Sequence, residues 1–503
     1  MKTAATLGVI AIAAAVIFIL IIGLVGSNKS TATGQHSRRS AEMAFNWIEC
    51  GKYSSMLRPG GGIEFSLLEN RTDIEAVERP FRELAEERTG SVDAYCDSPF
   101  QQQTNEDSSL FYLLAFLLLL WPGASLAQLY VLVTGMLSIG IALIGYAVWR
   151  WTRSVILSVG IVVAAAFWHS QLARFGIMTN HMFGWIFLLF TVFLMAWLVA
   201  EASSGTMRRA ALIAVVTGLT AAFAANMRST VQIEIPFLVL ATAIGVMSAT
   251  PPDPERWWRS RKLRHAIVLL SLMGIGWFTY GELAIRPYEA VNDGGLTNHP
   301  VAHVLVIGLA VPPNDLAREE GILWLDSRGL EIAERYRPGS TATMKQYNDA
   351  LFDYYFDLWR DRPGDMFRTY MGKAKITGTS LFPHARNFGI GWISPLILIQ
   401  NGIALGLILI LVATYSFMLS IGSPAGAFLL RALGISLVGG YLISLVIFPM
   451  ASLYIPEFPF TFILLTVVFW WASGRLALSA AIHYRITTDG WLGGKIRTAH
   501  QWW

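Results

Sequence analysis

The sequence contains little charge and almost no cysteine. Only 14% of its 503 residues are Asp, Glu, Lys or Arg, whereas 54% are hydrophobic, and the mean hydropathy is +0.49. These values exclude an ordinary soluble globular protein and are typical of a membrane protein with many crossings. The net charge of +4 is small. It comes mostly from short basic loops between apolar runs, so we expect no nucleic-acid partner.

Several catalytic signatures are missing from the sequence. It contains no P-loop, no Rossmann glycine pattern and no Ser-His-Asp constellation. His299 and His303 are four residues apart, and on a helix they could share a face and hold a metal. Pro300 and the strand-like run 304–308 argue against a helix. We therefore favour hydrogen-bonded loop histidines over a metal site, and we expect no metal and no cofactor.

Ten apolar runs are long enough for a bilayer crossing, which takes about 20 residues. They are 4–26, 125–149, 154–173, 182–201, 210–227, 230–249, 266–285, 391–414, 425–449 and 458–480. Basic residues gather in the turns 150–153, 208–209 and 256–264 and in the tail, which marks the cytoplasmic side. Counting crossings from a cytoplasmic N-terminus agrees with this assignment. We expect a multi-pass protein of the cytoplasmic (inner) membrane with both termini in the cytoplasm.

Two long polar segments interrupt the apolar runs, and the same count places both outside the cytoplasm. The predicted parts are an uncleaved first transmembrane helix (1–26), a first extracytoplasmic segment with an interfacial helix (27–124), a central bundle (125–285), a second extracytoplasmic segment (286–390), C-terminal transmembrane helices (391–482) and a basic cytoplasmic tail (483–503). The two polar segments could together build a reaction chamber at the outer membrane surface.

Local patterns predict elements within these polar segments. Residues 79–89 indicate a short solvated helix, and the apolar run 109–121, too short to cross comfortably, indicates the interfacial helix. An aromatic stripe with helical spacing occupies 347–359, and we expect it to pack against the membrane face or the first segment.

Both cysteines, Cys50 and Cys96, fall in the first outer segment. Outside the cytoplasm, two cysteines in one segment favour a disulfide, with two unpaired thiols as the alternative. The bond would close a loop of about 47 residues and stabilise the fold by about 4 kcal/mol in the chain-entropy model.

Charged residues within apolar spans are costly and are therefore functional candidates. Arg174 and Arg228 come at predicted outer helix ends, where they could bind a phosphate together. A structural ion pair between Arg228 and Glu234, about one and a half turns away, is an alternative of nearly equal weight.

Three stretches resemble the GT-C superfamily of membrane glycosyltransferases, which includes protein O-mannosyltransferases and aminoarabinose lipid A transferases. Residues 106–152 look like the family's interfacial helix and second crossing, 217–240 (TGLTAAFAANMRSTVQIEIPFLVL) like its "LTR" stretch, and 44–54 (AFNWIECGKYS) like the element after its first helix. The resemblance implies a GT-C-like α-helical bundle of about ten transmembrane helices with two large extracytoplasmic α/β loop regions.

The resemblance also implies a function. The expected enzyme moves a sugar from a polyprenyl-phosphate donor to an extracytoplasmic acceptor, a cell-envelope glycan, lipid or protein, in contact with membrane lipids. The family usually carries an Asp soon after its first helix, but here the stretch GQHSRRSAEMA has Glu42 as the nearest carboxylate, and Asn180-His181 stands where many members have another Asp. The alternative is therefore a catalytically lapsed GT-C scaffold that serves as a subunit of a membrane complex.

The transfer reaction needs a base for the acceptor hydroxyl and cations for the departing phosphate. The candidate bases are Glu42, Glu106, Asp107 and Asp326. The candidate phosphate-binding residues are Arg174, Arg228, His299 and His303.

Overall fold

The fold is known from a computed structural model that describes most of the first 379 residues. The described residues are 2–26, 35–53, 56–57, 78–98, 100–101, 108–152, 154–173, 180–204, 207–227, 229–249, 261–289 and 300–379, together with Phe428. The predicted crossings 391–414, 425–449 and 458–480 lie outside the described residues, apart from Phe428.

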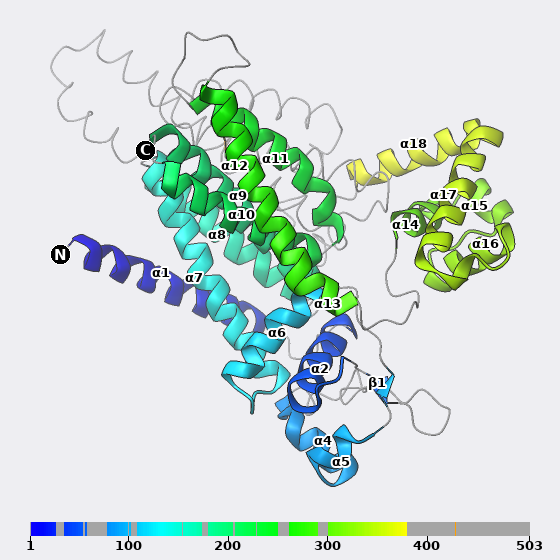
Figure 1. The fold of residues 1–503 in the computed structure, drawn as a ribbon, viewed down its shortest axis with the longest axis horizontal. Helices are drawn as coiled ribbons and strands as arrows, with labels where there is room; N and C mark the ends of the chain where they lie inside the picture. Colours follow the sequence, from blue (N-terminus) through cyan, green and yellow to red (C-terminus); the bar gives the residue numbers. More distant parts are fainter. Residues whose placement is uncertain are drawn as a thin grey trace.

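Long apolar helices form a bundle (Figure 1). Among the described residues these helices are α1 (Lys2–Gly26), α7 (Leu126–Thr152), α8 (Val155–Ala173), α9 (Asn180–Ser204), α10 (Met207–Met227), α11 (Ser229–Ala249) and α12 (Arg261–Tyr280). Each of the first seven predicted crossings coincides with one of these helices. α12 continues through a π-helical turn, η2 (Gly281–Ile285), into α13 (Arg286–Glu289).

Four helices of the described part are long and apolar enough to cross a membrane. By length and composition these are Leu126–Trp151, Ile186–Ser204, Met207–Met227 and Leu263–Tyr288. The protein is therefore an integral membrane protein, as its composition indicates. The number of crossings and the orientation of the termini stay predictions.

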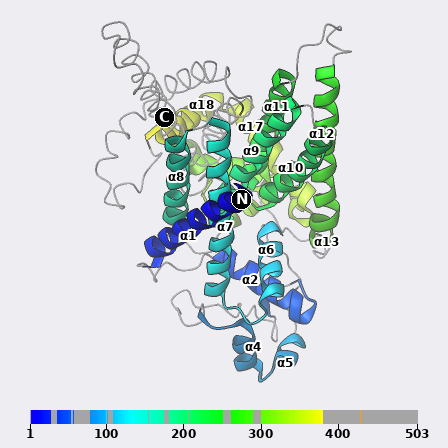
Figure 2. The ribbon, with the colours of Figure 1, turned by 90° about the vertical axis from the view of Figure 1, so that its left-hand side faces the viewer.

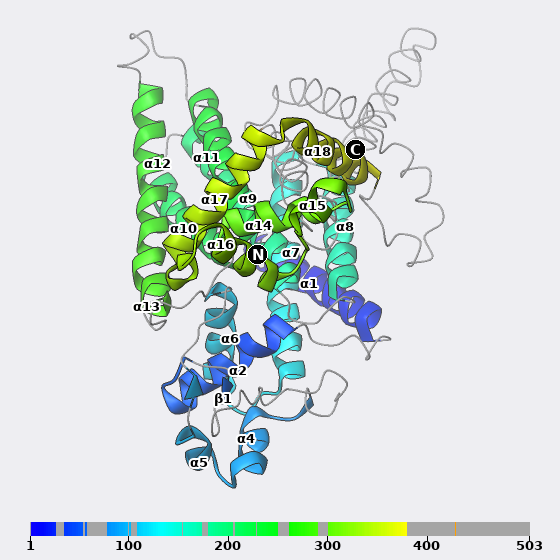
Figure 3. The ribbon, with the colours of Figure 1, turned by 90° about the vertical axis from the view of Figure 1, so that its right-hand side faces the viewer.

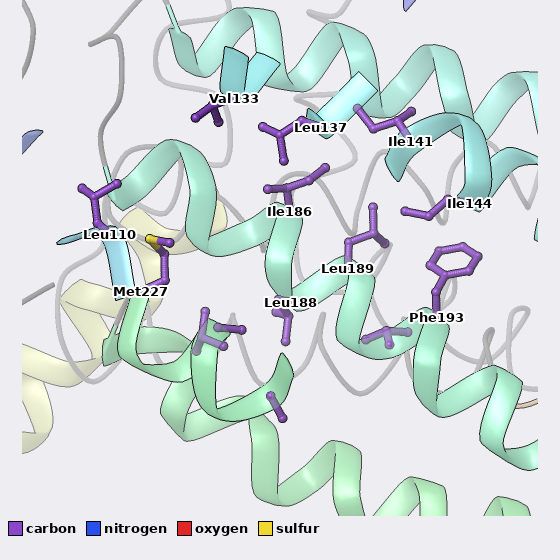
Figure 4. Packing of buried hydrophobic residues seen from close by; sticks show 14 of the residues in the cluster. Leu110, Val133, Leu137, Ile141, Ile144, Ile186, Leu188, Leu189, Phe193 and Met227 are labelled. Carbon is purple, nitrogen blue, oxygen red and sulfur yellow. The ribbon is translucent and has the colours of Figure 1, made fainter. Parts of the chain in front are cut away.

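The core of the bundle consists of interlocking aliphatic side chains. Leu137 of α7 points toward Ile186 of α9, and Ile144 and Phe193 of the same two helices lie further along (Figure 4). α9 and α12 both pack against α10. A Cβ atom added at Gly218 of α10 would lie 2.0 Å from the Met273 carbonyl oxygen of α12. α10 and α12 are therefore in backbone contact, which only glycine permits at this position.

We expect Gly218→Ala to push α10 and α12 apart. Overpacking of this kind costs about 1–3 kcal/mol, and it should lower the apparent unfolding temperature of the protein in lipid nanodiscs. Gly274→Ala is the matched control, because a Cβ at Gly274 of α12 meets nothing within 4 Å. Both changes gain the same helix propensity, so the difference isolates the contact. Equal unfolding temperatures would show that the helices are not in backbone contact.

The first outer segment is folded onto one end of the bundle (Figure 2). Its elements are α2 (Gln35–Cys50), β1 (Met56–Leu57), α4 (Phe81–Thr89), α5 (Val92–Cys96), β2 (Phe100–Gln101) and α6 (Ser108–Leu120). β1 and β2 form a two-stranded antiparallel ladder, with Met56 opposite Gln101. Phe45 stacks on Phe81, with ring centroids 5.6 Å apart. These rings share one hydrophobic core with the bundle, so the segment and the bundle form one packed body.

Two predicted helices of this segment are confirmed. α4 (Phe81–Thr89) lies within the helix predicted over 79–89, and α6 (Ser108–Leu120) includes all but the last residue of the apolar run 109–121. One face of α6, with Phe111 and Leu114, is buried, whereas Leu119 and Leu120 are exposed. This two-sidedness agrees with an interfacial position, which stays a prediction.

The predicted disulfide is confirmed. Cys50, the last residue of α2, is bonded to Cys96, the last residue of α5, and their Cα atoms are 5.1 Å apart. The bond ties α2 to the α4–α5 pair.

The second outer segment forms a separate helical unit with its own core. Its helices are α14 (Val301–Ile307), η3 (Gly308–Ala310), α15 (Asp315–Glu320), α16 (Asp326–Tyr336), η4 (Ser340–Ala342), α17 (Met344–Asp361) and α18 (Pro363–Thr379). The unit lies to one side of the bundle, apart from α2, α4 and α5 (Figures 1 and 3). The chamber built from both outer segments therefore stays a prediction.

Two sequence-based expectations fail in this unit. The described part of the second segment is helical rather than α/β. The strand-like run 304–308 belongs to α14 and η3 instead. Pro300 caps α14, where its missing N–H is not needed, and helical spacing places Ala302 and Val306 on the buried face. Burial of this face outweighs the strand preference of the valines.

The aromatic stripe of α17 also packs differently from the expectation. Tyr347, Leu351, Tyr354 and Leu358 are buried in the core of their own unit, and α17 packs against α14 and α16. The stripe therefore builds a local core rather than a contact with the first segment.

Candidate functional site

Three polar side chains from three helices of the second unit meet at one point. His303 of α14 lies between Asp326, the first residue of α16, and Tyr347 in the first turn of α17. His303 Nε2 is 3.4 Å from Asp326 Oδ1, and His303 Nδ1 is hydrogen-bonded to the Tyr347 hydroxyl. The structure thus brings together two predicted site residues, His303 and Asp326, that are 23 positions apart.

Burial differs sharply along this chain of contacts. The His303 side chain is only 2% exposed, whereas the Asp326 side chain is 72% exposed. Tyr347 is buried as well. The carboxylate therefore faces solvent, while the histidine and tyrosine behind it are held in the core.

The Tyr347 hydroxyl keeps its proton in this chain of contacts. Burial, and then the charge of Asp326, raises the pKa of Tyr347, so its phenol keeps its proton. The Tyr347 hydroxyl can therefore donate to Nδ1 of His303, in the tautomer whose imidazole proton lies on Nε2. Nε2–H then donates to Asp326 Oδ1. This arrangement fixes the rotamer of His303.

Gly329 makes the close approach possible. A Cβ atom at this position would lie 2.4 Å from His303 Nδ1 and 2.8 Å from the Tyr347 hydroxyl oxygen. α16 can therefore pass over the His303–Tyr347 pair only because residue 329 has no side chain. Gly329 was not among the residues that the sequence pattern indicated. The signal in the sequence is a glycine within a helical stretch, less than one turn after Asp326. A glycine at such a position usually permits a close packing contact.

Glu42 lies in a very different environment. Its side chain on α2 is 1% exposed, in the same core as Phe45 and Phe81. Burial and the Glu42 charge raise the pKa of the neighbouring Tyr95, while a hydrogen bond with Asn46 acts in the opposite direction. Glu42 is thus part of an interior polar cluster, where an acceptor sugar or protein does not reach it without rearrangement. Its role as a base stays a prediction.

The remaining predicted site residues lie outside the described residues. These are Glu106, Asp107, Arg174, Arg228 and His299. Glu234 of α11 is buried, and its predicted pairing with Arg228 stays open for the same reason. Among the described residues, no group of three or more His, Cys, Asp and Glu side chains could hold a metal ion.

Lys373 of α18 is a buried lysine that the sequence pattern did not indicate. Its ammonium lies 5.0 Å from the centroid of the Tyr370 ring, and the Tyr370 and Tyr355 hydroxyls are 2.6 Å apart. Burial lowers the pKa of Lys373 to about 7. The signal in the sequence is the spacing of three residues between Tyr370 and Lys373, which places both on one side of a helix.

Comparisons with known proteins find similarity only among solved structures. No family model and no curated protein matches the sequence. The chain is similar to the archaeal oligosaccharyltransferase AglB from Archaeoglobus fulgidus, solved with an inhibitory peptide and a dolichol-phosphate, with a TM-score of 0.37 and 13% identity. The match covers 99% of this chain and 54% of AglB, so the chain spans about half the length of that protein.

ArnT from Cupriavidus metallidurans is similar as well. The structure bound to undecaprenyl phosphate has a TM-score of 0.32 and 15% identity, and the match covers 96% of this chain and 81% of ArnT. The apo structure has a TM-score of 0.33 and 13% identity, over 90% of this chain and 78% of ArnT. GT-C enzymes are thus among the structures that this chain is similar to, as the sequence resemblance implies.

Proposed function

We propose that the chain is a GT-C-type glycosyltransferase that uses a polyprenyl-phosphate sugar outside the cytoplasm. The observation that carries the proposal is the exposed Asp326 carboxylate, which contacts the buried His303 side chain. His303 is in turn hydrogen-bonded to the buried Tyr347 hydroxyl. Asp326 would serve as a positioned base in the α14–α18 unit. This unit follows the helix Leu263–Tyr288, which is long and apolar enough to cross a membrane. The resemblance of residues 44–54, 106–152 and 217–240 to GT-C enzymes names the donor class.

The reaction is a displacement at the anomeric carbon of the donor sugar. Asp326 takes the proton of the acceptor hydroxyl as the acceptor oxygen bonds to the anomeric carbon. The bond from that carbon to the phosphate oxygen breaks, and its electron pair leaves with the polyprenyl phosphate. His303 donates Nε2–H to Asp326 and keeps the carboxylate oriented for the acceptor. General-base help of this kind contributes about 10²–10⁴-fold to a rate.

The departing phosphate needs cationic partners. Arg174 and Arg228 are our candidates, because they directly follow Ala173 and Met227, the last described residues of α8 and α10. Two arginines at helix ends on the same predicted side of the membrane could form charge-assisted hydrogen bonds to one phosphate at the depth of the lipid headgroups.

Binding of a polyprenyl phosphate tests the donor assignment without knowledge of the sugar. We expect undecaprenyl phosphate, a polyprenyl phosphate without a sugar, to remain bound to the protein in native mass spectrometry from nanodiscs. It should outcompete phosphatidylglycerol, an anionic lipid without the polyprenyl chain. The Arg174→Ala/Arg228→Ala variant should lose this preference, whereas Arg208→Ala, a change at the predicted cytoplasmic side, should keep it. Equal retention of both lipids by the unmodified protein would refute the donor assignment.

A lapsed GT-C scaffold is the second candidate. The burial of Glu42 favours it, because Glu42 is the nearest carboxylate to the position where related enzymes usually carry an Asp. In that case the protein would bind a partner subunit of a membrane complex, and substitution of Asp326 would leave its function intact.

A further inference from the structure

A short apolar loop protrudes next to Asp326. It connects α15 to α16 and contains Leu323, Trp324 and Leu325. Leu323 is 51% exposed and Leu325 is 57% exposed. Leu330, one helical turn after Asp326, is also exposed. Clustered large apolar side chains in solvent are unusual in a soluble domain and mark an interaction surface.

The loop is held in place from both sides. Gly321 ends α15 in the left-handed conformation, with φ of 66°, and Ile322 N–H donates to the Ala317 carbonyl over 2.7 Å. Ile322 itself is buried in the core of the unit. Arg328 Nε donates to the Gly321 carbonyl over 2.5 Å. Leu323 and Leu325 are therefore exposed on a loop whose backbone is fixed by hydrogen bonds, so their exposure is a property of the fold.

The surroundings of the unit indicate what covers this loop. Only ten residues, 290–299, separate Pro300 from α13, which continues from the apolar helix Leu263–Tyr288. Ten residues span at most about 36 Å. After α18 the sequence reaches the predicted crossing 391–414 within a similar distance. The helix Leu263–Tyr288 and the predicted crossing 391–414 would thus tether the unit to the membrane at both ends. Such tethering gives the bilayer a high effective concentration at the exposed apolar loop.

The charges near the loop indicate which kind of lipid headgroup the loop can contact. Residues 315–336 contain six acidic and three basic side chains, a net charge of −3. Attraction to anionic headgroups therefore cannot drive a contact between this loop and the membrane. Insertion of the leucine and tryptophan side chains into the bilayer can drive it.

We infer that the loop Leu323–Leu325, together with Leu330, inserts into the outer leaflet of the membrane and docks the α14–α18 unit there. The occupant of this surface is the lipid bilayer, and zwitterionic lipid is sufficient. Docking places Asp326 at headgroup depth, next to the inserted loop. If the proposed transfer reaction also holds, the acceptor of Asp326 is a membrane-anchored molecule. This last consequence rests on the proposed function, whereas the docking does not.

Spin labelling of the full chain in nanodiscs tests the docking. Both native cysteines form the Cys50–Cys96 disulfide, so Leu325→Cys provides a single site for a nitroxide. Oxygen concentrates in the bilayer and a nickel chelate stays in water, and the ratio of their collision rates with the label reports its depth. Lys345→Cys on the exposed side of α17 is the control. We expect a several-fold higher oxygen-to-nickel ratio at 325 than at 345.

The docking makes two further predictions for the same measurement. The ratio at 325 should be equal in discs of phosphatidylcholine and in discs that also contain phosphatidylglycerol. A label at Leu330→Cys should lose its high ratio when Leu323→Asp and Leu325→Asp are introduced. The inference is wrong if the ratio at 325 equals that at 345, if insertion needs anionic lipid, or if both reagents are excluded, which would indicate a protein contact. None of these readings depends on transferase activity.

Discussion

Asp326→Asn is expected to lower sugar transfer by about 10²–10⁴-fold, the usual contribution of a general base. The amide keeps the size of the side chain and can still accept a hydrogen bond from His303 Nε2, but it cannot take a proton from the acceptor hydroxyl. Binding of the polyprenyl-phosphate donor should be unchanged, because Asp326 acts on the acceptor. The effect should therefore appear in kcat, measured as release of free polyprenyl phosphate by liquid chromatography and mass spectrometry.

Asp349→Asn is the matched control for this experiment. Asp349 is an exposed carboxylate on α17 of the same unit, and its replacement should leave transfer within about twofold, because surface substitutions away from a site have small effects. Equal rates for Asp326→Asn and Asp349→Asn would remove Asp326 from the mechanism. The lapsed-scaffold alternative predicts no transfer by any of these proteins.

Gly329→Val is expected to abolish most of the activity without replacing a polar side chain. The added Cβ would lie 2.4 Å from His303 Nδ1, so His303 or α16 must move by about 1 Å. A displacement of this size can cost about 100-fold in rate, and overpacking costs about 1–3 kcal/mol of stability. The Tyr347–His303–Asp326 chain of hydrogen bonds should break as a result. Transfer rate and apparent unfolding temperature in nanodiscs measure the two effects.

Gly364→Ala is the control for Gly329→Val, because a Cβ at Gly364 of α18 meets nothing within 4 Å. It should leave both rate and unfolding temperature nearly unchanged. Tyr347→Phe separates packing from hydrogen bonding, since it removes only the hydroxyl that donates to His303. We expect a loss smaller than that of Gly329→Val. Full activity of Gly329→Val would show that the position of His303 is irrelevant to the reaction.

The helices of the bundle were predictable from the sequence because bilayer thickness sets the length of apolar runs. α7, α8 and α10 each begin and end within three residues of a predicted crossing. The disulfide was predictable because Cys50 and Cys96 are the two cysteines of the chain and fall in one polar segment.

Features that depend on tertiary packing were not predictable in the same way. α14 is a helix because burial of Ala302 and Val306 outweighs the local preference of its valines. His303 and Asp326 were separate candidates, one for phosphate and one for proton transfer, and only the packing of α14 against α16 shows that they are in contact. Gly329 gains its importance from the same packing, which no local pattern encodes.

The most direct test of the account is a transfer assay with the purified full chain in nanodiscs, supplied with polyprenyl-phosphate sugars and acceptors extracted from its native membranes. We predict that the unmodified protein converts polyprenyl-phosphate sugar to free polyprenyl phosphate, and that Asp326→Asn does so at least about 100-fold more slowly. Release at the same rate by the unmodified protein, by Asp326→Asn and by empty nanodiscs would contradict the account.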